Sequence, residues 1–373
     1  MLGLSKLLYF SKIFFINLVV ILIICEILFR YIYTPKSLSI RMEMNSLAQE
    51  KRSNTKLIFD REYLRFKPNS FRDISHQEYS VQTTHDKFGF RNPCINEIDK
   101  STEELFVGDS FVYGIGLSDN FTYGCQLKKN GLDAYTIGIP MIHVFRYMEI
   151  LKKNINIIKT KFPNLKNVNL VLFLGNDFET LIDYGSSDEN NDNKNSKRPL
   201  FRNYLAKLNY HLVKNKYLND IYSLNGIKLL LKPIVASADK GDYVKNHSGS
   251  TFYKKSTIKK VSQITKSFEK FQKDLSLLDL KLKSIYLIED PASLDSVRLQ
   301  GDMMVARFKN YKELDVDFKV KNILLSCNQL QIKCFDTTLF LKSENYYKHD
   351  NHLRNNGAQI LTKFITNQQK NLN

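Results

Sequence analysis

Residues 105–110 read Leu-Phe-Val-Gly-Asp-Ser, and the fold is best worked out from this stretch. Its first three residues form a short, unbroken apolar run, which is typical of a strand buried on both faces of a parallel sheet. Gly108 and Asp109 then favour a turn, and Ser110 stands where the next helix would begin. Reactive groups in an open parallel sheet gather at the carboxyl ends of the strands. We therefore expect Ser110 at such an edge.

Other short apolar runs alternate with amphipathic stretches along the chain. The candidate strands are residues 104–107, 133–137, 168–174, 284–288 and 331–335, and the candidate helices lie near 120–130, 142–158, 256–282, 303–328 and 356–368. Strands separated by helices of this length indicate βαβ units. The predicted fold class is α/β, a three-layer sandwich with a central parallel sheet.

Polar residues follow two more of the candidate strands. Gly138 ends the second strand, Asn176 follows the third, and His352 lies near the C-terminus with Asp350 two positions before it. A serine hydroxyl becomes a good nucleophile when a histidine takes its proton and a carboxylate orients that histidine. We therefore predict Ser110, His352 and Asp350 as catalytic residues. The expected oxyanion hole combines the backbone N–H groups of Ser110 and Gly138 with the side-chain amide of Asn176.

Each of these residues also has a plainer interpretation. A lone Gly-Asp-Ser can be an ordinary turn, and His349 is an alternative base to His352. Asn176 and Asp177 are residue types that cap helices, and we expect Asp177 to cap and Asn176 to act as donor. His143 lies near the predicted site, where it can contact substrate or pack at a helix end.

The N-terminal segment, residues 7–33, is strongly apolar, and between Ile13 and Cys25 only Asn17 is polar. A membrane-spanning helix needs about 20 mostly apolar residues. A cleaved signal peptide would need small residues before a cleavage site, and none follows the apolar run. We therefore predict an uncleaved transmembrane anchor over residues 1–33.

The remaining chain divides by composition. We expect an irregular extension over residues 34–100 and an α/β domain over 101–373. Residues 185–197 contain no apolar side chain, which favours a surface insertion. The expected helical insertion covers about 185–283.

The overall charge excludes little by itself. The chain carries 55 basic and 38 acidic residues, a formal net charge of +17, but its lysines are spread along the sequence. Without an RNA-binding signature or zinc-ligand spacing, we expect no nucleic-acid partner, no metal and no cofactor. The cysteines lack a Cys-x-x-Cys pair, and pairing and free thiols both stay open for four of them; the five are Cys25, Cys94, Cys125, Cys327 and Cys334.

The order of these motifs resembles the SGNH hydrolases, also called the GDSL family. The four family blocks are matched by Ser110, Gly138, Asn176 and His352. The longer matches look like a membrane-anchored bacterial branch associated with cell-surface polysaccharides; they are residues 88–91, 106–116, 173–177 and 350–357. The resemblance covers about 86–184 and 284–368, and it implies the flavodoxin-like SGNH fold.

Three departures from the family pattern are visible. Many members place the aspartate three residues before the histidine, whereas Asp350 precedes His352 by two. Thr136 stands where an asparagine often precedes the second-block glycine, and Met141 occupies a place often held by a second glycine. None of these departures removes a catalytic group, but Thr136 and Met141 are expected to alter the pocket wall.

The leading hypothesis is a serine esterase that removes O-acyl groups, expected to be O-acetyl, from an extracytoplasmic glycan or similar ester. The resemblance and the predicted span through residues 7–33 imply a single-pass protein of the cytoplasmic membrane with its catalytic domain on the periplasmic side. An O-acetyltransferase using the same site is one alternative. A non-catalytic glycan-binding or assembly protein is another, because a fold alone does not establish activity.

Overall fold

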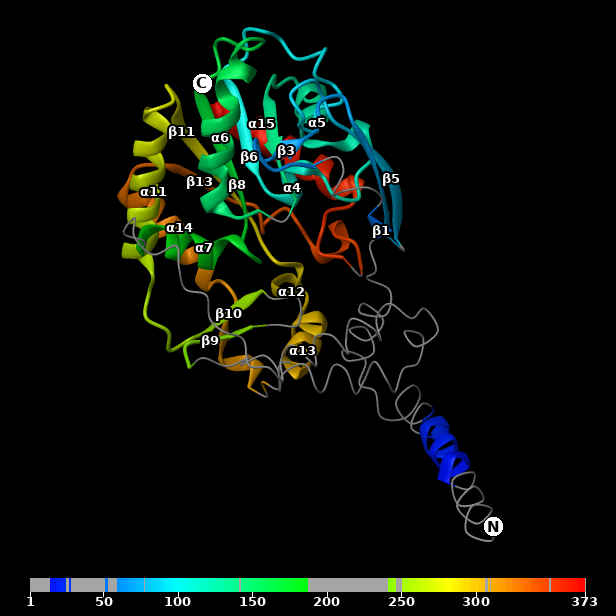
Figure 1. Ribbon diagram of the computed structural model, residues 1–373. Helices are drawn as coiled ribbons and strands as arrows, with labels where there is room; N and C mark the ends of the chain where they lie inside the picture. The colour runs from blue at the N-terminus through cyan, green and yellow to red at the C-terminus, as the bar shows by residue number, and fades with distance from the viewer. Residues whose placement is uncertain are drawn as a thin grey trace.

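Among the residues that the computed structural model describes, five parallel strands form the central sheet (Figure 1). The strands pair in the order β13–β11–β8–β6–β7. They are β6 (Glu104–Gly108), β7 (Tyr135–Gly138), β8 (Asn167–Phe173), β11 (Lys281–Ile288) and β13 (Lys333–Asp336). The strand order reverses between β6 and β8, and ligands of such sheets bind where the order reverses.

The structure describes the chain in several ranges. These are residues 14–24, 27, 51–52, 59–76, 78–140, 142–186, 241–245, 250–305, 308, 310–348 and 350–372. Besides the helical residues 14–24, their α-helices are α4 (Ser110–Tyr113), α5 (Tyr123–Lys129), α6 (Val144–Lys159), α7 (Asp177–Ser186), α11 (Val261–Ser276), α12 (Pro291–Leu294), α13 (Ser296–Val305), α14 (Phe318–Gln329) and α15 (Asn355–Leu372). Short 3₁₀ turns lie at η2 (Asp119–Phe121), η3 (Tyr311–Glu313) and η4 (Ser343–Asn345).

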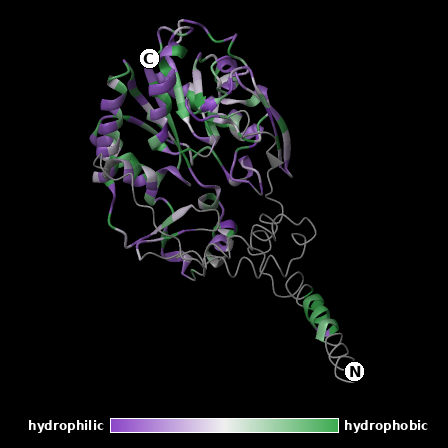
Figure 2. Ribbon diagram, in the orientation of Figure 1, coloured by the Kyte–Doolittle hydropathy of each residue, from purple (hydrophilic) through white to green (hydrophobic). Residues whose placement is uncertain are grey.

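Helices cover both faces of the sheet. Alternate residues of a strand point to opposite faces, so Leu105 and Val107 of β6 join a core with α6, α11 and α14. Phe106 faces the other way and joins a core with α5 and α15. Figure 2 shows hydrophilic residues on α6 and α11 where these helices face outward. This arrangement agrees with the α/β part of the predicted fold class.

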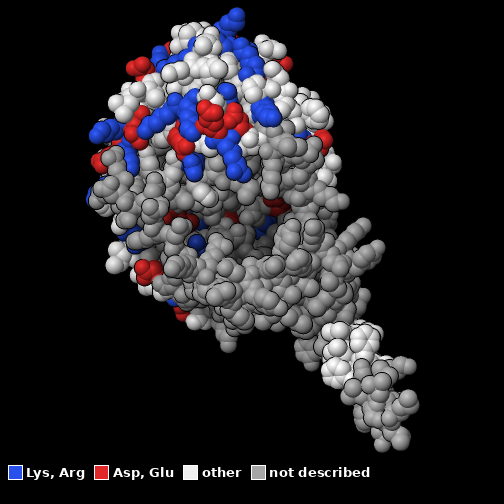
Figure 3. Space-filling model, viewed as in Figure 1, with Lys and Arg blue, Asp and Glu red and all other residues white. Residues whose placement is uncertain are grey.

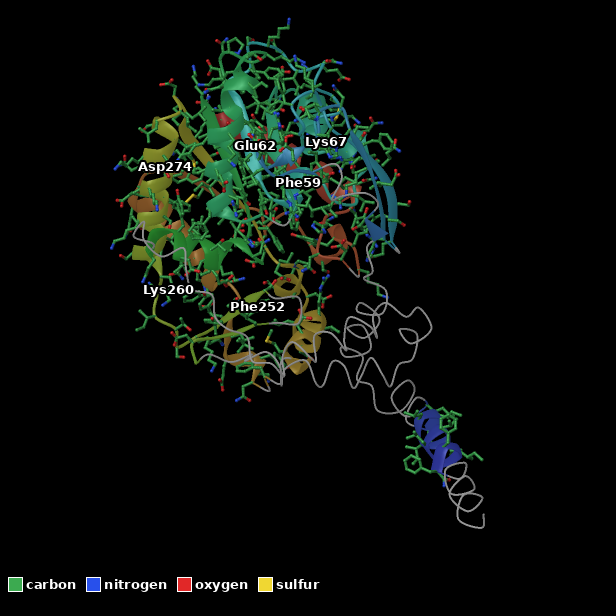
Figure 4. All side chains as sticks on the ribbon, viewed as in Figure 1. Phe59, Glu62, Lys67, Phe252, Lys260 and Asp274 are labelled. Atoms are coloured by element: carbon green, nitrogen blue, oxygen red, sulfur yellow. A yellow bond between two sulfur atoms is a disulfide. The ribbon has the colours of Figure 1, made fainter. Side chains whose placement is uncertain are left out.

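Small antiparallel sheets flank this core in the described part of the chain. The strands β1 (Lys51–Arg52), β4 (Phe71–His76) and β5 (Tyr79–Thr84) form one sheet, and β2 (Phe59–Asp60) pairs with β3 (Arg65–Phe66). The third sheet joins β9 (Tyr243–Lys245), β10 (Thr251–Lys254) and β12 (Leu314–Asp315). Phe252 of β10 lies in the lower part of the molecule (Figure 4). β9 and β10 fall within the expected helical insertion, and residues 187–240 and 246–249 lie outside the described residues.

The predicted transmembrane helix over residues 7–33 is wrong. In the described part of the chain, no helix has the length and apolar character that crossing a membrane requires. The predicted single-pass location in the cytoplasmic membrane rested on this span and is corrected with it.

Candidate active site

Ser110 lies at the carboxyl end of β6, where α4 begins. The Asp109 side chain caps this short helix, because its Oδ1 accepts a hydrogen bond from Phe111 N at 2.9 Å. A Cβ atom at Gly108 would lie 2.8 Å from the carbonyl oxygen of Val171 on β8. A glycine before the turn therefore lets the serine-bearing turn pack directly against the neighbouring strand.

His352 and Asp350 meet Ser110 although they lie far away in sequence. Nε2 of His352 is 2.8 Å from Ser110 Oγ, and Nδ1 is 2.6 Å from Asp350 Oδ1. A carboxylate can only accept, so Nδ1 carries the donated proton and Nε2 is free to accept from the serine hydroxyl. The ring of Phe111 packs 5.3 Å from the His352 ring and forms one wall beside it. The structure thus brings the three predicted catalytic residues together.

The Asp350 carboxylate is held in its ionised form. Burial raises the pKa of this carboxyl. The His352 charge and the hydrogen bonds from His352 and Tyr79 lower it by more than burial raises it, so the pKa lies below its ordinary value. The charge of His76 acts in the same direction. Asp350 is therefore a stable negative charge beside His352 throughout the neutral pH range.

Gly138 ends β7 directly opposite Gly108 of β6. An ideal Cβ at Gly138 would lie 2.1 Å from Tyr113 N, so no side chain fits between β7 and α4. The close approach places the end of β7 against the helix that carries Ser110. Gly138 therefore lies at the edge of the site, as the sequence predicts, and its packing against α4 is a second reason for a glycine there.

Asn176 reaches the same edge from the β8–α7 turn. Its Nδ2 donates to Asp109 Oδ2 at 3.2 Å, which links the turn after β8 to the turn after β6. Asp177 is fully buried, and its Oδ2 accepts from Tyr147 OH and Phe173 N, each at 3.1 Å. Burial and the nearby Asp109 charge raise the pKa of Asp177 well above its usual range. Asp177 thus fixes the turn internally, while Asn176 faces Asp109.

Asn92, at the end of the stretch at residues 88–92, supports the site from outside the sheet. Asn92 Oδ1 accepts from Thr136 N at 3.2 Å and Oγ1 at 2.5 Å, while Asn92 Nδ2 donates to Thr136 O at 2.9 Å. The side chain of Asn92 therefore bonds the edge strand β7 as an adjacent strand would. Thr136, which departs from the family pattern, is thus part of this contact.

Arg91 holds the turn that follows the serine-bearing helix. Its guanidinium donates to the carbonyls of Tyr113, Gly114 and Leu117 and pairs with Asp119 at 3.0 Å. The side chain is almost completely buried. In the sequence Arg91 is visible only as the end of the stretch 88–91 that resembles the family. A buried arginine is uncommon unless it is paired, but nothing in the sequence alone reveals that burial.

The other histidines named from the sequence are placed differently. His143 is exposed and lies at the N-cap position of α6, where its side chain makes no capping hydrogen bond. His349 and Met141 lie outside the described residues.

Comparisons with known proteins leave the family unassigned. No family model and no curated protein matches the sequence. The inhibitor-bound aryl esterase of M. smegmatis aligns with 73% of this chain and 100% of its own, at 10% identity and a TM-score of 0.32. Another solved structure aligns with 73% of this chain and 99% of its own, at 8% identity and a TM-score of 0.33. Likenesses this low carry no argument about activity, so function must be argued from the site itself.

Proposed function

We propose that this chain is a serine esterase with Ser110 as nucleophile, His352 as base and Asp350 as the carboxylate that orients the base. The observation that carries the proposal is the unbroken contact from Ser110 Oγ through the His352 ring to Asp350, at 2.8 and 2.6 Å. Both distances fall within the range that proton transfer between positioned groups requires.

The chemistry follows from these contacts. Ser110 Oγ attacks the acyl carbonyl while His352 Nε2 takes the serine proton, and a tetrahedral oxyanion forms. His352 then gives the proton to the leaving alkoxide, which departs as an alcohol and leaves Ser110 acylated. Water attacks the acyl-enzyme with His352 again as base, and the carboxylic acid leaves.

The proposed oxyanion donors are the N–H groups of Ser110 and Gly138 and the side-chain amide of Asn176. Asn176 Nδ2 carries two N–H bonds, so its bond to Asp109 leaves one available for substrate. Asp109 is buried, and its bond orients the amide at the strand edge. Gly138 supports the same role by bringing the end of β7 against α4.

For the substrate we propose a short acyl ester of a carbohydrate, expected to be an acetyl ester. The support is the resemblance of the motifs around Ser110 and His352 to SGNH hydrolases. Transfer of the acyl group to a second sugar hydroxyl would use the same acyl-enzyme. An added sugar acceptor that is acetylated faster than water reacts would replace hydrolysis with transfer as the proposed reaction.

The test is hydrolysis of 4-nitrophenyl acetate by the full chain. Ser110→Ala should lower kcat by at least about 10⁴-fold, because loss of a triad serine removes the covalent route. Ser118→Ala is a matched control, since Ser118 is exposed and its side chain makes no cap bond. A fluorophosphonate should label the wild-type chain at Ser110. Full activity in Ser110→Ala, or no labelling of Ser110, would overturn the proposal.

A further inference from the structure

The second oxygen of the Asp350 carboxylate has its own donor. Asp350 Oδ1 accepts from His352, and Asp350 Oδ2 accepts from the Tyr79 hydroxyl at 2.6 Å. Tyr79 begins β5 and lies 271 positions before Asp350. A hydrogen bond to a charged acceptor is stronger than one between neutral groups. Both oxygens of the Asp350 carboxylate therefore accept hydrogen bonds, one from His352 and the other from Tyr79 in the N-terminal part of the chain.

The Tyr79 ring is itself immobilised. It is 8% exposed and lies between the rings of His76 and Tyr347, with centroids at 4.9 and 4.8 Å. A Cβ at Gly116 would come within 2.7 Å of the Tyr347 ring and 3.1 Å of the Tyr79 ring. Gly116, at a φ of 77°, thus leaves room for both rings close behind the serine-bearing helix. The hydroxyl has little freedom to leave Asp350.

The neighbour of Tyr79 contacts the same loop from the β4–β5 turn. Glu78 Oε1 accepts from the backbone N–H of Lys348 at 2.8 Å, and Arg354 Nη2 lies 3.6 Å from that oxygen. Arg354 is largely exposed, so its ion pair contributes little. The backbone bond and the Tyr79 bond reach the loop on either side of position 349. The hairpin turn therefore contacts the histidine-bearing loop at more than one point.

We propose that Tyr79 is a positioning residue that fixes the Asp350 carboxylate against His352, and that Glu78 supports it by holding the backbone of Lys348. This inference rests on the proposed esterase function. A carboxylate with a donor on only one of its oxygens can rotate about its Cβ–Cγ bond, and this rotation would weaken its hydrogen bond to the histidine. A second, rigid donor sets the plane of the carboxylate and directs Oδ1 at His352 Nδ1.

The kinetic test is Tyr79→Phe, which keeps the ring between His76 and Tyr347 and removes only the hydroxyl. We expect kcat for 4-nitrophenyl acetate to fall about tenfold with KM unchanged, equivalent to about 1.4 kcal/mol of activation free energy. Tyr184→Phe is the matched control, because Tyr184 OH makes a similar bond to Asp274 at 2.8 Å. Asp274 lies on α11 at the outer side of the molecule (Figure 4). This control should keep the wild-type kcat, and both variants should keep the wild-type thermal midpoint within a few degrees.

A spectroscopic test separates this inference from the esterase proposal. The proton between His352 Nδ1 and Asp350 should give a low-field ¹H NMR signal, identified by its loss in Asp350→Asn. We expect Tyr79→Phe to shift that signal and Tyr184→Phe to leave it in place. An unchanged signal or an unchanged kcat in Tyr79→Phe would overturn the positioning role. If Ser110→Ala stayed fully active, the esterase mechanism would fail, but the NMR signal would still report whether Tyr79 positions Asp350.

Discussion

At the scale of single residues, the site depends on polar side chains that link separate strand ends. Asn176 joins the end of β8 to Asp109 at the end of β6, and Tyr79 joins β5 to Asp350. Each link fixes the orientation of a group that the proposed reaction uses. Small changes in these side chains should therefore alter rate more than they alter stability.

Asn176→Ala tests the proposed oxyanion donor. The variant loses one N–H donor that would be stronger in the transition state than in the ground state, so kcat should fall about 100-fold or more while KM changes little. Steady-state kinetics with an acetyl ester provide the measurement. Asn130→Ala is a suitable control, because Asn130 Nδ2 only reaches Thr362 Oγ1, at 3.5 Å, at the end of α5. A rise in KM with kcat unchanged would show that Asn176 binds substrate without acting on the oxyanion.

The sequence could point to some of these residues and not to others. Ser110 is part of a local pattern with a strand before it, and Asp350 and His352 are two positions apart, so short-range spacing was informative. Tyr79 offered no such signal. It is one of 20 tyrosines, and its contact with Asp350 arises only when the hairpin folds over a loop 271 positions away.

At the scale of elements, the serine-bearing helix α4 is too short to be stable alone and is held by its neighbours. Four residues form little more than one turn, and isolated short helices are marginal in water. Arg91 binds the carbonyl of the last residue of α4 and two carbonyls after it. The Tyr113 hydroxyl lies 3.0 Å from both Thr83 Oγ1 and His85 Nε2. The small β1–β4–β5 sheet and the segment after it therefore hold α4 against the central sheet.

His85 gives this support a pH dependence. Burial lowers the pKa of His85 to about 3, offset in part by a bond to the Ser70 backbone, and the Arg91 and Arg72 charges lower it further. Below pH 6.5 the unfolded chain binds a proton that the folded chain does not bind until about pH 3. The contribution of His85 to the free energy of unfolding is therefore complete above pH 6.5 and falls by about 1.4 kcal/mol per pH unit below it.

His85→Gln removes this titration, so denaturant unfolding between pH 6.5 and 4.5 should show a weaker loss of stability than in the wild type. His143→Gln is the matched control, because His143 is exposed, and it should reproduce the wild-type slope. Equal slopes in the wild type and His85→Gln would exclude His85 as the source of the pH dependence.

The elements themselves were unequally predictable. The strands β6, β7 and β8 were visible as mostly apolar runs because every one of their residues is buried between the two helical layers. β4 alternates between exposed and buried positions, but two of its three buried residues are Arg72 and His76. Polar residues on the inner face conceal the apolar alternation that marks a strand, so the extension was expected to be irregular.

At the scale of the whole molecule, composition alone supported two interpretations: a membrane span at residues 7–33 and a basic chain whose lysines are spread out. The apolar segment at residues 7–33 suggested a membrane span, but no helix in the described part of the chain is long and apolar enough to cross a membrane. Basic residues outnumber acidic ones in the sequence, but on the surface the two kinds lie next to each other (Figure 3). Figure 3 shows Lys and Arg interleaved with Asp and Glu on the upper face, consistent with pairs such as Lys152–Asp274 and Lys153–Glu149.

Two disulfides are present among the described residues, and they connect the molecule at different ranges. Cys94–Cys125 spans 31 positions and ties the segment before the central sheet to α5, whereas Cys327–Cys334 spans seven and joins α14 to β13. The sequence left pairing open, because spacing alone does not distinguish paired from free thiols. In the chain-entropy description, a bond that closes a longer loop restricts the unfolded chain more.

The last prediction compares these two bonds. Loop lengths of 31 and seven correspond to about 3.7 and about 2.4 kcal/mol of stabilisation. The double variant Cys94→Ala/Cys125→Ala should therefore lower the thermal unfolding midpoint by about 10 °C, and Cys327→Ala/Cys334→Ala should lower it by less. Calorimetry without reductant measures both, and reductant should bring the wild type towards the variants. A larger loss from the short loop would show that local packing, rather than restriction of the unfolded chain, sets the contribution of these bonds. In that case the segment around Cys94 would be held to the sheet mainly by contacts such as those of Arg91 and Asn92.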